Sequence, residues 1–136
     1  MLLVVDTNRI IAAVLRDSSS RRILSSKKLA FITPRFAYHE VLRHRASLIA
    51  KSGLSGRAFD STLYSILSKI RQVDNAELAP FFESASKVMA EIDYSDILFI
   101  ALALSTSNDG IWTEDRHFER QSVVRVWKTA ELLQLL

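Results

Sequence analysis

Short apolar runs alternate along the chain with segments in which apolar residues recur every three or four positions. The apolar runs predict strands at residues 2–5, 29–32, 111–113 and 123–126, with a further small extended segment at 71–73. The recurring positions predict helices after Asp6, over residues 21–24, 34–53, 55–70, 77–91 and 93–104, and from Thr129 onward. This alternation predicts an α/β protein with a parallel sheet, covered by helices on both faces and joined by right-handed crossovers.

Capping residues indicate where several of these helices begin. Thr33 followed by Pro34 is a helix-start signature, because a capping side chain is followed by proline at the first helical position. Ser18 to Ser20 offer caps for the short helix that follows them, and Asp93 offers one for the very apolar helix that it opens. Residues 107–110 (Ser-Asn-Asp-Gly) are then predicted to form a turn before the next strand.

Composition indicates one folded domain over residues 1–136. Hydrophobic residues make up 49% of the chain, with only three Gly and two Pro, which excludes a disordered or low-complexity chain. The absence of Cys excludes disulfides, thiolate zinc sites and a cysteine nucleophile. The longest apolar run, residues 97–104, is far shorter than the ~20 residues of a membrane span, and residues 1–5 lack the basic segment of a signal peptide. We therefore expect a cytoplasmic protein with no membrane partner.

Acidic residues stand at positions that a parallel sheet would bring to one edge. Asp6 and Asp115 each follow a predicted strand by zero to one residues. Ligands of open parallel sheets bind beyond the carboxyl ends of the strands, where the strand order reverses. Glu40 lies about two turns into the helix that begins at Pro34. Asp96 lies in the first turn of the helix 93–104. We therefore expect these four carboxylates to converge.

Converging carboxylates need a compensating charge. A pair of carboxylates 4 Å apart repels by ~1 kcal/mol in water and by ~4 kcal/mol at an effective dielectric constant of 20. Hard oxygen ligands with no His or Cys nearby favour Mg²⁺ or Mn²⁺ over zinc, and such an ion would activate a water and stabilise the charge that develops on a phosphate. Because that chemistry needs no histidine, His44 and His117 are expected to be polar surface residues.

The segments around these acids resemble, in order, the motif blocks of PIN-domain nucleases. The four segments are Val4–Asn8, Tyr38–Leu42, Asp93–Leu104 and Trp112–Phe118, and together they extend over essentially the whole chain. The resemblance implies a PIN-like, Rossmann-like three-layer α/β/α sandwich with a central parallel sheet. It also implies a Mg²⁺- or Mn²⁺-dependent ribonuclease that hydrolyses RNA phosphodiester bonds with metal-activated water.

The same resemblance assigns roles to individual residues. It implies that the catalytic, metal-binding quartet is Asp6, Glu40, Asp96 and Asp115. Asp93 resembles an additional acid found in part of the family, and the polar residues that would support the site are Thr7, Asn8 and Thr113. Many PIN proteins of this length are toxins of VapC-like toxin–antitoxin pairs and are often dimeric. The partners implied are therefore an RNA substrate, an antitoxin and a second copy of the chain.

The residues outside this acidic cluster carry a net positive charge, which favours binding of a polyanion. The chain has 18 Lys and Arg against 15 Asp and Glu, so if five acids line a pocket, ten acids remain against eighteen cations elsewhere. Arginines that flank the acidic segments are the best candidates for contacts with RNA phosphates. These arginines are Arg35, Arg43, Arg45 and Arg116.

Other interpretations of the first strand and its acid are less consistent with the sequence. Dinucleotide binding needs a glycine-rich turn where Asp6-Thr7-Asn8 stands, and a haloacid-dehalogenase-type phosphatase needs a second Asp at the position of Asn8. The remaining alternative is a catalytically silent PIN-fold module that binds RNA or a protein. The presence of all four acids favours the enzyme.

Overall fold

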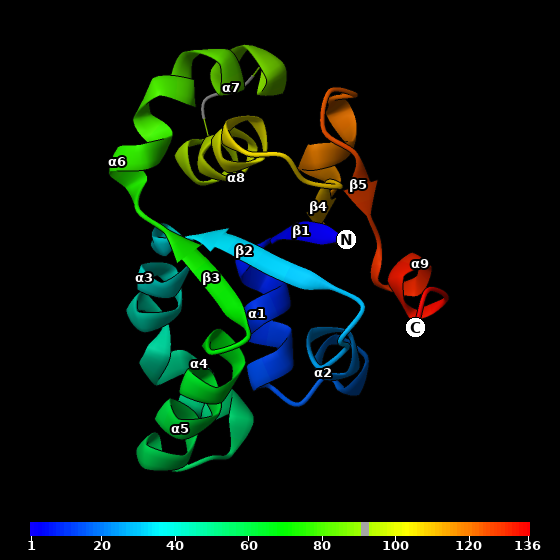
Figure 1. The fold of residues 1–136 in the computed structure, drawn as a ribbon. Helices are drawn as coiled ribbons and strands as arrows, with labels where there is room; N and C mark the ends of the chain where they lie inside the picture. The colour runs from blue at the N-terminus through cyan, green and yellow to red at the C-terminus, as the bar shows by residue number, and fades with distance from the viewer. Residues whose placement is uncertain (91–92) are drawn as a thin grey trace.

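A parallel sheet of five strands, in the order β3-β2-β1-β4-β5, forms the centre of the computed structural model, which describes residues 1–90 and 93–136 (Figure 1). Every pairing in the sheet is parallel: for example, Leu3 lies opposite Phe31 and Val5 lies opposite Trp112. The strands are β1 (Leu2–Val5), β2 (Ala30–Pro34), β3 (Ile70–Val73), β4 (Ile111–Trp112) and β5 (Val126–Trp127).

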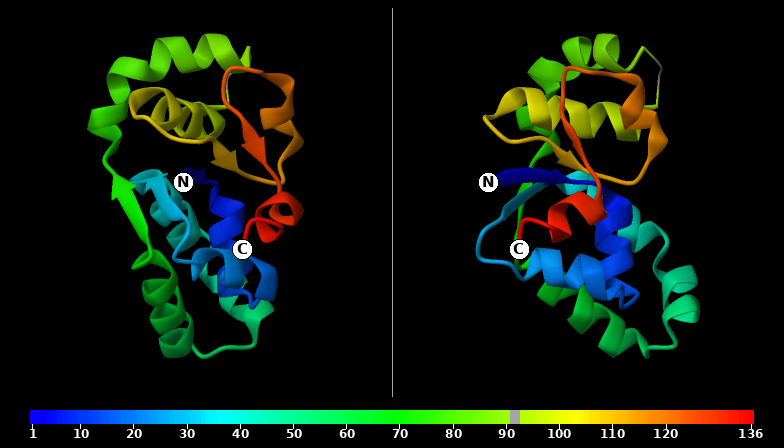
Figure 2. Two further views of the ribbon diagram at one scale, coloured as in Figure 1. Left: turned by 45° about the vertical axis from the view of Figure 1, so that its right-hand side comes forward. Right: turned by 90° about the vertical axis from the view of Figure 1, so that its right-hand side faces the viewer.

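Helices cover both faces of the sheet because the chain adds strands first on one side of β1 and then on the other side. From β1 outward to β3 the chain places its helices on one face, and on its return past β1 to β4 it places them on the other, as right-handed crossovers require (Figures 1 and 2). This arrangement confirms the predicted three-layer α/β/α sandwich. The first layer contains α1 (Thr7–Val14), α2 (Ser18–Leu24), α3 (Arg35–Arg43), α4 (Arg45–Ser52) and α5 (Gly56–Leu67). The second layer contains α6 (Asn75–Leu78), η1 (Ala79–Phe81), α7 (Phe82–Met89) and α8 (Tyr94–Ser105).

The core explains the unusual composition of α8. This helix lies between the sheet and α7, so residues 97–102 are buried on every side, and a helix buried all round is apolar all round. The short 3₁₀ helix η2 (Arg116–Arg120) follows β4, and α9 (Thr129–Leu133) packs against α2. Among the described residues, no helix has both the length and the apolar character needed to cross a membrane.

Two of the predicted helix caps were wrong. Thr33 does not cap a helix: its Oγ1 donates a hydrogen bond to the backbone oxygen of Val5 at 2.8 Å, and β2 continues through Pro34. The helix expected over 34–53 is interrupted at His44, which separates α3 from α4. Asp17, and not Ser18 to Ser20, caps α2 by accepting from the backbone N–H of Ser20 at 2.8 Å.

Three other predicted boundaries also differ from the structure. The helix predicted over 77–91 begins earlier, at Asn75. It is divided near Pro80, because proline lacks the N–H that a regular helix needs. Glu91 lies outside the described residues. The helix over 55–70 ends at Leu67, since Ile70 pairs with β2. The last strand is Val126–Trp127 and not 123–126. Here the Gln121 side chain bonds both the N–H and the oxygen of Val124, which closes a loop in place of a strand.

The turn before β4 depends on Gly110. The side-chain oxygen of Asn108 accepts from the N–H of Gly110 at 2.9 Å, and Gly110 has a φ of +127°. A Cβ at this position would lie 2.3 Å from the backbone oxygen of Arg125, which itself accepts from the N–H of Ile111. Glycine is therefore required where β4 enters the sheet between β1 and β5.

Candidate active site

The point where the strand order reverses carries a buried carboxylate. The chain runs from β1 to β3 on one side and resumes at β4 on the other side of β1, so the ends of β1 and β4 are adjacent. Asp6 follows β1 and Thr113 follows β4. The hydroxyl Oγ1 of Thr113 donates to Oδ2 of Asp6 at 2.6 Å, and both residues are buried. Asp6 also caps α1, with a long hydrogen bond of 3.4 Å from the backbone N–H of Asn8.

Thr113 links a second carboxylate to the first. Its Oγ1 also accepts from the backbone N–H of Asp115 at 3.0 Å. Asp115 in turn caps η2 by accepting from the N–H of His117 at 2.9 Å. The neighbouring Glu114 turns to α9, where it accepts from the N–H of Thr129. One hydroxyl therefore sets the spacing between Asp6 and the loop that carries Asp115.

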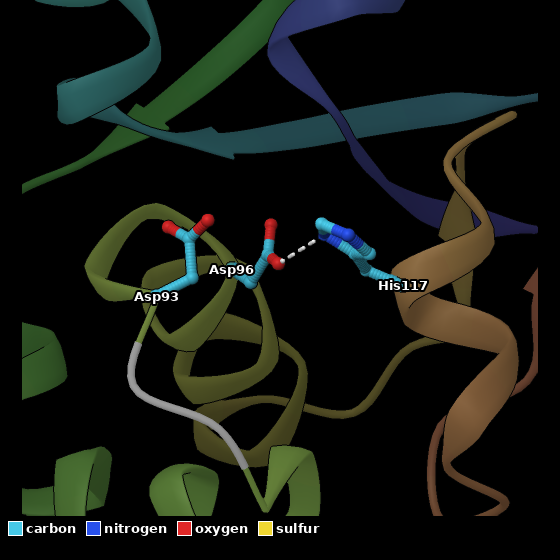
Figure 3. Close-up of side chains that lie close together, drawn as sticks. All are labelled: Asp93, Asp96 and His117. Atoms are coloured by element: carbon cyan, nitrogen blue, oxygen red, sulfur yellow. Dashed lines mark hydrogen bonds and ion pairs between the residues drawn. The ribbon is translucent and has the colours of Figure 1, made fainter.

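The first turn of α8 brings two more acids, and η2 brings a histidine. Asp93 caps α8, and Asp96 lies one turn further, where Nδ1 of His117 approaches its Oδ2 to 3.1 Å (Figure 3). The same Nδ1 lies 3.7 Å from Oδ1 of Asp115. Asp96 stands between the other two side chains in Figure 3, and ligand atoms of Asp93, Asp96 and His117 all lie within 4.8 Å of one another. His117 thus connects α8 to the strand ends.

Glu40 joins this edge from α3. Oγ1 of Thr7, the residue after Asp6, donates to Oε1 of Glu40 at 2.7 Å. Arg43 on the same helix approaches Oε2 of Glu40 to 3.9 Å. Thr7 and Thr113 therefore each hold an acid through a side-chain hydroxyl, whereas the contact of Asn8 with Asp6 is made by its backbone N–H.

The position of His117 differs from the one predicted from the sequence. We expected it at the surface with no histidine near the acids, but its ring nitrogen contacts Asp96 although the side chain is 45% exposed. His44 is exposed between α3 and α4, as expected. No pattern in the sequence indicated this contact, because it depends on how η2 folds back toward α8. Imidazole nitrogen is also a good ligand for zinc and other transition metals. The group formed by Asp93, Asp96 and His117 is therefore not specific for Mg²⁺ or Mn²⁺.

Burial makes the central carboxylates costly to ionise. Burial, with a further contribution from the nearby Asp93, raises the pKa of Asp96 to about 6. Burial also raises the pKa of Asp6, and the charge of Asp115 acts in the same direction. The hydrogen bond from the Ser95 hydroxyl lowers the pKa of Asp93. A positive charge placed among these groups would favour their ionised forms.

The raised pKa of Asp96 predicts a pH-dependent stability in metal-free protein. Between pH 3.8, the ordinary value, and about 6, the folded state keeps a proton that the unfolded chain has released, so this residue destabilises the fold increasingly as the pH rises through that window. Asp96→Asn should therefore raise the free energy of unfolding at pH 7 by about 1–3 kcal/mol and by much less near pH 4.

Urea unfolding in EDTA at several pH values measures this gain. Glu83→Gln, which alters an exposed acid on α7, is the control and should change stability little at any of these pH values. A gain from Asp96→Asn that is equal at pH 4 and pH 7 would contradict the assignment.

The predicted arginines occupy different environments. Arg35 pairs with Asp74 at 2.7 Å, and Arg45 binds both oxygens of Asp60 at 2.8 and 2.9 Å. Arg43 on α3 and Arg116, directly after Asp115, are solvent-exposed, as Arg35 also is.

Arg9 lies one turn after Asp6 on α1 and was not among the predicted site residues. It is close enough to Asp6 to favour the ionised form of that acid. Its Nε is buried and has no hydrogen-bond partner among the described residues. The helical spacing of three residues from Asp6 was the signal that could have identified it.

Fold and site together define an α/β/α domain with an acidic centre at the switch point of a parallel sheet. Residues 4–136 match the PIN domain family, and the chain belongs to that family. Among solved structures, it resembles the crystal structure of VapBC2 from Rickettsia felis bound to a DNA fragment from their promoter. The TM-score is 0.74 at 17% sequence identity, over 94% of this chain and 98% of that chain, which shows a shared fold. The comparison with curated proteins gave no match.

Proposed function

We propose that the chain is an endoribonuclease that depends on a divalent cation, Mg²⁺ or Mn²⁺, and hydrolyses RNA phosphodiester bonds with water. The observation that supports this most strongly is the hydroxyl of Thr113, which joins Asp6 to Asp115 where the strand order reverses. Other carboxylates reach the same edge from α3 and α8, although like charges repel there. Membership of the PIN domain family supports the same activity.

The donors at this edge fit a divalent cation. Carboxylate oxygens suit Mg²⁺ and Mn²⁺, and the raised pKa values of Asp6 and Asp96 are those of carboxylates that would gain from a nearby positive charge. When bound, the cation would lower the pKa of a water and offset the charge that develops on the phosphate. The proposed ligands are Asp6, Asp96 and Asp115, with Glu40 completing the set or holding a second, weaker ion and Asp93 auxiliary.

The remaining polar groups orient these acids. Thr113 and Thr7 hold one oxygen of Asp6 and of Glu40, respectively, before any substrate binds. His117 holds one oxygen of Asp96 in the same way. Such outer hydrogen bonds set the direction in which a carboxylate presents its other lone pairs, and their loss typically reduces metal affinity or activity 10- to 100-fold.

Arginines around the acids would bind the phosphates of the RNA. Arg35, Arg43 and Arg116 are exposed, and Arg35 and Arg45 would exchange a carboxylate partner for a phosphate. Because these contacts are electrostatic, RNA binding should weaken steadily as the salt concentration rises.

We also propose that the ribonuclease acts in the cytoplasm as the toxin of a toxin–antitoxin pair and forms a homodimer. The motif resemblance to VapC-like proteins and the fold shared with VapBC2 support a protein partner. A small DNA-binding protein encoded by the adjacent gene that co-purifies with this chain and inhibits cleavage would support the pair.

A cation at this edge should stabilise the folded protein. Mg²⁺ or Mn²⁺ is expected to raise the melting temperature, because a ligand that binds only the folded state stabilises it by about 2.7 kcal/mol at one hundred times its Kd. Asp6→Asn removes both a ligand and a repelling charge, so it should melt above wild type in EDTA and gain less from the cation. Thermal melts with EDTA and with each cation measure both effects. An equal metal response in wild type and Asp6→Asn would count against Asp6 as a ligand.

A further inference from the structure

Three aromatic side chains form a small cluster beside the acids, which we call the aromatic shelf: Phe36, Phe82 and Tyr94. Tyr94 contacts Phe36 with ring centroids 5.8 Å apart and Phe82 with centroids 5.9 Å apart, at interplanar angles of 88° and 77°. Both contacts are edge-to-face, which fixes the orientation of the Tyr94 ring. The residue is nevertheless 52% exposed. The exposed part of Tyr94 is therefore held in a fixed orientation by the other two rings.

The shelf borders the proposed metal centre on two elements. Tyr94 lies in the first turn of α8, between Asp93 and Asp96, whose side chains emerge from the same turn in Figure 3. Phe36 lies on α3 one helical turn before Glu40, so α3 carries both an aromatic member of the shelf and an acid of the centre. The Tyr94 ring therefore contacts the turn of α3 that precedes Glu40.

The chemistry of the shelf fits a nucleobase. Unpaired bases of single-stranded RNA stack on aromatic side chains with little dependence on sequence, because every base has a π face. Two arginines of α3 could hold the flanking phosphates: Arg35, which precedes Phe36 and is paired with Asp74, and Arg43, which lies two helical turns after Phe36. An apolar protein segment would gain less from a surface with charged groups of both signs around it.

We propose that Tyr94 is a substrate-positioning residue that stacks an unpaired base next to the phosphate held at the acidic centre. This inference rests on the proposed function and adds to it a residue that positions the substrate. Because Phe36 lies one helical turn before Glu40, a base stacked on Tyr94 would place its neighbouring phosphate toward the edge where the acids lie.

Binding to two oligonucleotides tests the proposal. One is a short single-stranded RNA, and the other has the same length and backbone but abasic riboses. Measurements use the Asp6→Asn background with Mg²⁺, with a gel to verify that the RNA stays intact. Tyr94→Leu, which keeps an apolar contact with Phe36 and Phe82, should weaken binding of the RNA about 5- to 100-fold and leave binding of the abasic strand unchanged. Tyr94→Phe should bind both strands within about two-fold of the parent.

Tyr64→Leu is the matched control. Tyr64 is 79% exposed on α5, on the face of the sheet opposite α8, and its replacement should affect neither strand (Figure 1). Equal loss of both strands in Tyr94→Leu, or no loss of either, would overturn the proposal; the shelf would then be a structural or protein-docking surface. If binding depends on the bases and on Tyr94 but the wild-type protein cleaves no RNA, the stacking role of Tyr94 would be supported and the proposed ribonuclease activity would be contradicted. Binding of neither strand by the Asp6→Asn parent would refute both.

Discussion

Asp6→Asn is expected to reduce RNA cleavage by about a hundred-fold or more while leaving the protein folded. Asp6 is buried at the switch point, and the side-chain change removes a negatively charged ligand without changing its size. A bound cation contributes several kcal/mol of stabilisation to the charge that develops on the phosphate, and each 1.36 kcal/mol corresponds to a factor of ten in rate. The measurement is the cleavage rate of a labelled single-stranded RNA with Mg²⁺ and with Mn²⁺.

Metal removal and a distant acid provide the controls for this experiment. EDTA should abolish cleavage by wild type, whereas Glu83→Gln on the exposed side of α7 should cleave at the wild-type rate. Cleavage that survives both EDTA and Asp6→Asn would point to a different site or to a contaminating nuclease. RNA that is bound but not cut with any cation would instead favour the catalytically silent PIN-fold alternative.

Gly110→Ala is expected to have the largest effect on stability. Its φ of +127° is unfavourable for a side chain, and the new Cβ would lie 2.3 Å from the backbone oxygen of Arg125. Left-handed backbone costs roughly 1–2 kcal/mol and overpacking typically 1–3 kcal/mol, so the free energy of unfolding should fall by about 3 kcal/mol. The oxygen of Gly110 also accepts from the N–H of Val4, so a shift here would disturb β1 as well as β5.

Gly53→Ala separates these two contributions. Gly53 ends α4 with a φ of +69°, but a Cβ there meets nothing within 4 Å, so this variant should lose only about 1 kcal/mol. Urea unfolding of the two variants gives the comparison directly. If Gly110→Ala is no less stable than Gly53→Ala, the close approach to Arg125 does not constrain the turn before β4.

The layers of the fold were predictable from the pattern of apolar residues. The strand at 2–5 has the predicted bounds, and the very apolar segment after Asp93 is a helix that is buried between the sheet and α7. The boundaries that failed depend on partners distant in sequence. The hydroxyl of Thr33 bonds β1 in place of capping a helix, and the side chain of Gln121 closes a loop where a strand was expected.

The candidate site was predictable to the extent that it follows from topology. Residues directly after strands must lie at one edge of a parallel sheet, which places Asp6 and Asp115 there. The approach of His117 to Asp96 depends on how η2 folds back toward α8, and helical or strand periodicity carries no information on such a contact. The edge-to-face packing of Tyr94 between α3 and α7 could not be predicted for the same reason.

The proposed function requires acids from distant parts of the chain to hold one divalent cation at the switch point of the sheet. A crystal structure with saturating Mn²⁺, in which the ion is located by its anomalous scattering, would show whether they do. We predict a manganese ion in contact with the carboxylates of Asp6, Asp96 and Asp115. Manganese bound by Asp93, Asp96 and His117 without Asp6, or no manganese at this edge, would contradict the account.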